Sequence, residues 1–130
     1  MKLIELLNAQ VALKNLTEKN FTNYKVLRDL AKLRKAVNAE VEFYTEQERK
    51  AVLQYADKDE KGQPIFIDNG RLKLRDIESK SAFDEELSKL RNLEIDSIEK
   101  VEVKESDFRS TADFPTSDEM LTLECIVNFE

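Results

Sequence analysis

The chain contains no histidine and no tryptophan, and it has a single cysteine, Cys125. One thiol cannot form an intrachain disulfide, and without histidine the usual nitrogen ligands of zinc, copper and iron sites are missing. These absences argue against a secreted disulfide scaffold and against a zinc module. We therefore expect no cofactor and no functional metal site.

Glycine and proline are also scarce, with two residues of each among 130. Few sharp turns are available, so the helices and strands should be long. A chain of this length can bury a core without cross-links, and we expect a single domain over residues 1–130.

Long apolar runs are missing as well. No stretch approaches the roughly 20 apolar residues that span a bilayer, because charged side chains recur every few positions. Glu5 and Asn8 interrupt the apolar N-terminus, which we interpret as the start of a helix and not as a signal peptide. We expect a cytoplasmic protein that has no membrane partner.

Charge is plentiful but unevenly distributed. The net charge is −6, which makes nucleic acid an unfavoured partner because phosphate backbones attract basic surfaces. Residues 1–36 hold eight basic and three acidic residues, a balance of +5, whereas residues 37–130 hold 13 and 24, a balance of −11. This asymmetry favours association in which the basic region of one molecule meets an acidic partner surface.

Hydrophobic periodicity predicts three helices and a short terminal one. Residues 2–18 place Leu3, Ile4, Leu7, Val11 and Ala12 on one helical face. Residues 22–56 contain neither Gly nor Pro and predict a helix roughly 50 Å long, capped by Thr22 or Asn23. Its apolar stripe consists of Leu27, Leu30, Leu33, Val37, Val41, Tyr44, Val52 and Tyr55. A third helix should begin near Ser81 and use Phe83, Leu87 and Leu90 as its apolar face, which Leu93 could extend.

A hairpin is predicted at Asn69-Gly70, because both residues tolerate positive φ and stand between alternating runs. A two-residue turn there pairs Ile67 with Leu72 and Ile65 with Leu74 on one buried face. Residues 98–103 also alternate and predict a further strand. The predicted fold is α+β and predominantly α, with long antiparallel helices and a small antiparallel sheet made of the hairpin and this strand.

The last segment, residues 116–130, contains a capping box formed by Thr116 and Glu119. It predicts a short helix, although the β-branched pair Ile126-Val127 leaves a strand as the alternative.

Three short patterns suggest chemistry, but each has a stronger structural explanation. Residues 57–62 begin like a calcium loop, yet Lys61 cannot ligate calcium and Asp68 is shorter than the glutamate required at the last position. Ser97 and Lys100 match a Ser-x-x-Lys pattern without its partner motifs. Cys125 has no histidine to activate it. We therefore do not expect an enzyme.

Lys25, Arg28, Lys32 and Lys35 are spaced by three, four and three residues, which places them on one face of the second helix. We call these four residues the basic stripe. They form a candidate site for an anion or an acidic partner. The alternative is the solvated back of an amphipathic helix.

The same helix offers a candidate self-association face. A helix too long for its own domain leaves part of its apolar stripe to be covered by a neighbouring molecule. The residues of this face are Val41, Tyr44, Val52 and Tyr55.

Several segments carry a family resemblance: Leu3-Ile4-Glu5-Leu6-Leu7-Asn8, Phe43-Tyr44-Thr45-Glu46-Gln47-Glu48-Arg49, Tyr55-Ala56-Asp57-Lys58-Asp59-Glu60-Lys61-Gly62, Phe83-Asp84-Glu85-Glu86-Leu87-Ser88-Lys89-Leu90 and Thr116-Ser117-Asp118-Glu119-Met120-Leu121. In this order they resemble a small family of uncharacterised proteins of tailed bacteriophages and prophages, defined only as a domain of unknown function. The resemblance implies a phage or prophage origin and a role in particle assembly or in managing the host. It implies a place in the host cytoplasm or in the virion and supplies no active site.

We therefore expect a non-enzymatic interaction or assembly protein that forms homo-oligomers through its long helix, with other phage proteins as further partners. The alternative is a nucleic-acid-associated phage accessory factor that uses the basic stripe.

Overall fold

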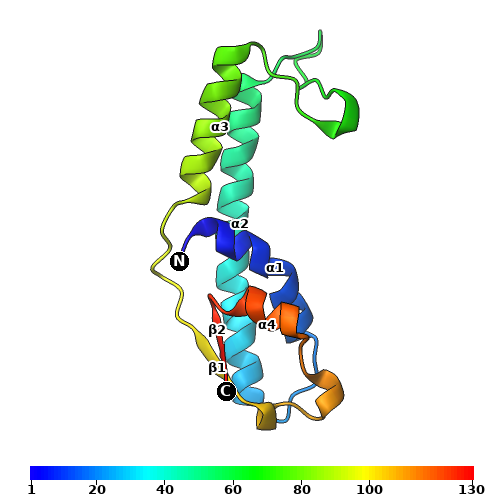
Figure 1. The fold of residues 1–130 in the computed structure, drawn as a ribbon, viewed down its shortest axis with the longest axis vertical. Helices are drawn as coiled ribbons and strands as arrows, with labels where there is room; N and C mark the ends of the chain where they lie inside the picture. The colour runs from blue at the N-terminus through cyan, green and yellow to red at the C-terminus, as the bar shows by residue number, and fades with distance from the viewer. The chain divides into compact units, whose positions relative to one another are not determined.

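The computed structural model describes residues 1–130, with the exception of the side chain of residue 68. Within this part of the chain four α-helices form, α1 (Leu3–Thr17), α2 (Tyr24–Tyr55), α3 (Ile77–Arg91) and α4 (Ser117–Leu123) (Figure 1). Two short strands, β1 (Val101–Val103) and β2 (Val127–Phe129), accompany them. Three single-turn 3-10 helices are η1 (Asp68–Gly70), η2 (Glu105–Asp107) and η3 (Thr111–Asp113). Of the helices described, none has the length and apolar character that crossing a membrane requires.

The chain divides into two compact units. The first unit consists of Met1–Val41 and Glu94–Glu130, and the second consists of Glu42–Leu93. Helix α2 contributes its beginning to the first unit and its end to the second. The expectation of a single domain stays a prediction.

Helix α1 supplies much of the first unit's core, but the predicted face is only partly right. Its buried side chains are Leu3, Leu6, Ala9, Ala12, Leu13 and Leu16. Ile4 and Leu7 are half-buried, and Val11 is 68% exposed. The helix is apolar on more than one side, so its periodicity alone does not determine which side meets the core.

Aromatic packing ties distant segments of the first unit together. Phe21 stacks on Phe108 with ring centroids 4.7 Å apart, and Phe108 meets Phe114 edge-on at 5.4 Å. In α2 the predicted stripe is confirmed for Leu30, Leu33 and Val37, which are buried in this unit.

Side-chain caps fix two helix starts of the first unit at predicted positions. The Asn23 Oδ1 atom accepts from the N–H groups of Lys25 and Val26 at 3.2 and 3.3 Å, so Asn23 caps α2. The capping box before α4 is present: Glu119 N–H donates to Thr116 Oγ1 at 3.2 Å, and Thr116 N–H donates to Glu119 Oε1 at 3.1 Å. Both alternatives for residues 116–130 occur in succession, because α4 ends at Leu123 and β2 follows.

The sheet is parallel, so the predicted antiparallel sheet is wrong. Strand β1 pairs with β2 in the register Val101 with Val127 and Val103 with Phe129. The prediction of a strand within residues 98–103 is right, but its partner is the C-terminal segment and not the hairpin. The chain returns through η2, η3 and α4, a connection long enough to bring two strands together in the same direction.

In the second unit, the end of α2 packs antiparallel to α3 (Figure 1). Arg91 Nε donates to the Tyr44 hydroxyl at 3.2 Å, and the Tyr55 and Phe83 rings meet edge-on at 6.4 Å. Helix α3 begins at Ile77, one turn earlier than predicted, because the Asp76 carboxylate accepts from Ser79 N–H at 2.7 Å and caps it there.

The hairpin turns where it was predicted, with positive φ of 67° at Asn69 and 70° at Gly70. Its register is wrong by one residue: Phe66 pairs with Leu72, and Ile67 N–H donates to the Arg71 carbonyl at 2.8 Å. The loop takes in three residues in place of two, and a slip of one residue changes every cross-strand pair.

Because the register differs, the prediction of a single buried face on the hairpin is also wrong. Ile65, Leu72 and Leu74 are only half-buried, and Ile67 is 45% exposed.

Candidate functional site

The structure brings the basic stripe together as predicted. Lys25, Arg28, Lys32 and Lys35 are all exposed on the first part of α2. Among the ion pairs of the described residues, none includes a member of the stripe. The neighbouring Arg34 behaves differently, because it is half-buried and donates to Thr17 Oγ1 at 3.0 Å. The stripe therefore consists of four exposed cations that no ion pair of the described residues neutralises.

A groove of about 590 Å³ lies beside the stripe, between the start of α2 and residues 97–102. Lys25, Asp29 and Lys32 line its helical side, and Leu33 and Val101 contribute apolar surface. Ser97 and Lys100 of the Ser-x-x-Lys pattern both line it, in an irregular segment and not on a helix. Sequence reasoning missed this groove because its two walls are far apart in the chain.

The candidate self-association face lies mostly against its own chain. Tyr44 is 7% exposed, while Val41, Val52 and Tyr55 are half-buried. Burial raises the pKa of Tyr44, and the nearby Glu48 carboxylate adds to the rise. These residues therefore leave less apolar surface for a neighbouring molecule than the sequence suggests.

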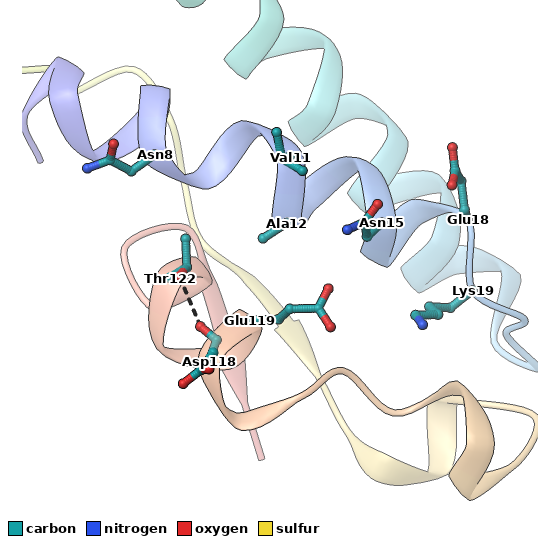
Figure 2. A pocket seen from close by; sticks show the side chains of 9 residues that line it. All are labelled: Asn8, Val11, Ala12, Asn15, Glu18, Lys19, Asp118, Glu119 and Thr122. Carbon is teal, nitrogen blue, oxygen red and sulfur yellow. Dashed lines mark hydrogen bonds between the residues drawn. The ribbon is translucent and has the colours of Figure 1, made fainter.

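A second open pocket, of about 610 Å³, lies between α1 and α4 (Figure 2). Much of its polar lining serves α4 itself: Glu119 belongs to the capping box, and Thr122 Oγ1 donates to the Asp118 carbonyl at 2.9 Å, the dashed line in Figure 2. Asn8 and Asn15 of α1 line the opposite side. This lining offers hydrogen-bonding groups, and Glu18 and Lys19 add charges of both signs.

Cys125 lines an adjacent pocket of about 580 Å³. The side chain is half-buried, and burial raises the pKa of its thiol, with the Glu5 carboxylate contributing. A raised pKa keeps the sulfur protonated at neutral pH, which makes it a weak nucleophile.

Two carboxylates of the calcium-like loop have partners within the chain. Asp59 Oδ1 accepts from the N–H groups of Lys61 and Gln63 at 2.9 and 3.0 Å, and Asp57 pairs with Lys73 at 3.3 Å. Over the described part of the chain, no group of three or more His, Cys, Asp or Glu side chains is placed to hold a metal ion.

Comparison with known proteins adds no assignment, because no family model, curated protein or solved structure matches this chain. The resemblance to phage and prophage proteins therefore stays a prediction from the sequence.

Proposed function

We propose that this protein is a non-enzymatic interaction or assembly protein of the phage and prophage type, which acts through helical self-association. In this proposal the basic stripe of α2 in one copy meets an acidic surface of another. The observation that carries it is the stripe itself, four exposed cations without an ion-pair partner among the described residues.

Complementary charge is present within the same unit. Residues 94–130 hold three basic and 11 acidic residues, a balance of −8. Among the exposed acids are Asp96, Glu105 and Glu124, whereas Glu94 already pairs with the Met1 ammonium group at 3.3 Å. Four exposed ion pairs at about 0.2–1 kcal/mol each contribute about 1–4 kcal/mol, which corresponds to roughly 5-fold to 1000-fold in Kd. Association should therefore weaken as salt screens these charges.

The test is the mass of the protein in solution, measured by light scattering at tens of micromolar. We expect a specific oligomer at low salt that dissociates at about 0.5 M NaCl, because the Debye length then falls below about 5 Å. Arg28→Glu with Lys35→Glu should yield a monomer. Lys50→Glu with Lys80→Glu changes the net charge equally at exposed positions of the second unit and should leave the oligomer intact. A monomeric parent protein at low salt would refute the proposal.

The second candidate is a nucleic-acid-associated accessory factor, supported by the spacing of the stripe along one helix face. A fluorescent duplex DNA is the probe. If DNA binds the parent protein, weakens steeply with salt and fails to bind the Arg28→Glu, Lys35→Glu variant while the protein stays monomeric, this second function replaces the first.

A further inference from the structure

The chain before and within β1 presents backbone groups that have no partner. Val101 N–H donates to the Ile126 carbonyl at 3.1 Å, and the Val103 carbonyl accepts from Glu130 N–H at 2.9 Å, so these two residues bond to β2. Successive residues of a strand direct their backbone N–H and C=O groups to opposite edges. The N–H and C=O of Glu102 therefore point away from β2. Within the described structure, residues 96–100 make no backbone–backbone hydrogen bond either.

These free groups lie at the groove of about 590 Å³ described above. Its apolar surface comes from Val26 and Leu33 of α2 and from Ile98 and Val101. Leu33 is buried and the other three are half-buried, so an occupant would cover apolar surface that the chain itself leaves partly open. The groove thus combines an unpaired strand edge with an apolar floor.

We propose that this groove binds an extended acidic peptide segment of a protein partner, which adds as a strand to the free edge of β1. An extended backbone supplies donors and acceptors in the alternation that such an edge requires. A helix has already used most of its backbone groups internally, and a nucleic-acid backbone offers phosphate acceptors that cannot satisfy the free carbonyls. This inference rests on the interaction role proposed above but not on self-association.

The charge of the helical wall determines the choice of an acidic peptide. Lys25 and Lys32 line the groove on α2, Arg28 and Lys35 continue the positive charge beside it, and Asp29 is the single acid of this wall. The opposite wall carries Glu99, Lys100 and Glu102, so the excess of positive charge lies on α2. Because successive side chains of a strand point to opposite faces, the acidic side chains of one face meet the lysines of α2, and their aliphatic parts cover Val26 and Leu33.

The experiment measures the fluorescence polarisation of a labelled octapeptide of four Val-Glu repeats, with a Val-Lys octapeptide for comparison. The acidic peptide should bind at least about tenfold more tightly than the basic one, and the difference should shrink with salt. In ¹⁵N-labelled protein, the amide signals of residues 97–102 should shift on addition of the acidic peptide.

Glu102→Pro tests the strand addition itself. It removes the N–H that points to the free edge and leaves the bonds of Val101 and Val103 to β2 in place, so we expect at least about a tenfold loss of affinity. Glu102→Ala retains that N–H and should lose less than about twofold. If Glu102→Pro fails to fold by circular dichroism, Lys100→Pro with Lys100→Ala makes the same comparison outside β1.

The double variant Lys25→Glu, Lys32→Glu tests the role of charge and should weaken peptide binding about tenfold. The double variant Lys50→Glu, Lys80→Glu changes the net charge equally and serves as the control. The inference is overturned if the acidic peptide does not bind at about 1 mM, or if the proline and alanine variants bind equally well. It is also overturned if Glu102→Pro abolishes self-association in the absence of peptide, because the free edge of β1 would then bind a second copy of the chain.

The two proposals can fail separately. If the protein is monomeric at low salt and binds the peptide, self-association is refuted and the groove proposal is supported. If the protein is oligomeric and does not bind the peptide, self-association is supported and the groove proposal is refuted.

Discussion

Asp107 is a buried carboxylate whose removal should destabilise the first unit strongly. It is 7% exposed and lies in η2. Its Oδ1 accepts from Asn23 Nδ2 at 2.9 Å, and its Oδ2 accepts from Lys104 N–H at 2.8 Å. The carboxylate thus joins the segment after β1 to the residue that caps α2.

The magnitude follows from these two charge-assisted hydrogen bonds. Each contributes about 1.5–3 kcal/mol, and the exposed Asn23 amide can recover part of its loss by turning to water, so Asp107→Ala should cost about 2–4 kcal/mol. An unfolding entropy of about 2.1 cal/mol/K per residue gives about 0.27 kcal/mol/K for 130 residues. The Tm should therefore fall by about 10 °C.

The assay is thermal and urea unfolding followed by circular dichroism. Asp107→Asn retains the size and one acceptor and should cost about half as much as Asp107→Ala. Glu105→Ala is the matched control, since Glu105 belongs to the same 3-10 turn and is exposed. If Asp107→Ala unfolds within about 0.5 kcal/mol of this control, the carboxylate does not hold these segments together and the reasoning is refuted.

Three further outcomes are expected. Thr116→Ala removes half of the capping box of α4 and should lower the unfolding free energy by about 1 kcal/mol in urea titrations. Gly70→Ala places a side chain at a φ of 70° and should cost about 1–2 kcal/mol in the same assay, whereas a loss below about 0.3 kcal/mol would contradict the turn geometry. Burial raises the pKa of Tyr44, so the stability that its protonated form contributes is complete below about pH 10 and is lost as pH rises through the folded-state pKa. Tyr44→Phe should reduce this alkaline loss of stability, measured as urea midpoints from about pH 8 to 11.

The features that local sequence predicts well are those that depend on a few neighbouring residues. Asn23, the Thr116 capping box and the Asn69-Gly70 turn each act within about four residues of chain. The two caps occur as predicted, and the turn occurs at the predicted place with a loop of three residues instead of two. The four residues of the basic stripe lie on one helix, so their shared face also follows from local sequence, whereas their role as a binding site stays a prediction.

The features that sequence reasoning missed depend on contacts between segments that are far apart in the chain. Val11 is exposed because α1 is apolar on several sides and the rest of the unit decides which side is covered. β1 could have paired in either direction, and no local signal specifies the partner that it meets in β2. The groove beside the basic stripe joins residues 23–36 to residues 97–102, so no window of sequence contains it.

The interrupted first unit has a consequence for folding during synthesis. Phe21 stacks on Phe108, but the second unit is made between them. At about 5–20 residues per second, roughly 4–17 s pass on the ribosome before Phe108 follows Phe21 into the growing chain. During that time the leucines of α1 have no C-terminal partners, whereas residues 42–93 are contiguous and can fold as they emerge. The first unit is therefore begun first and completed last, and the apolar side chains of α1 wait for their partners throughout the synthesis of the second unit.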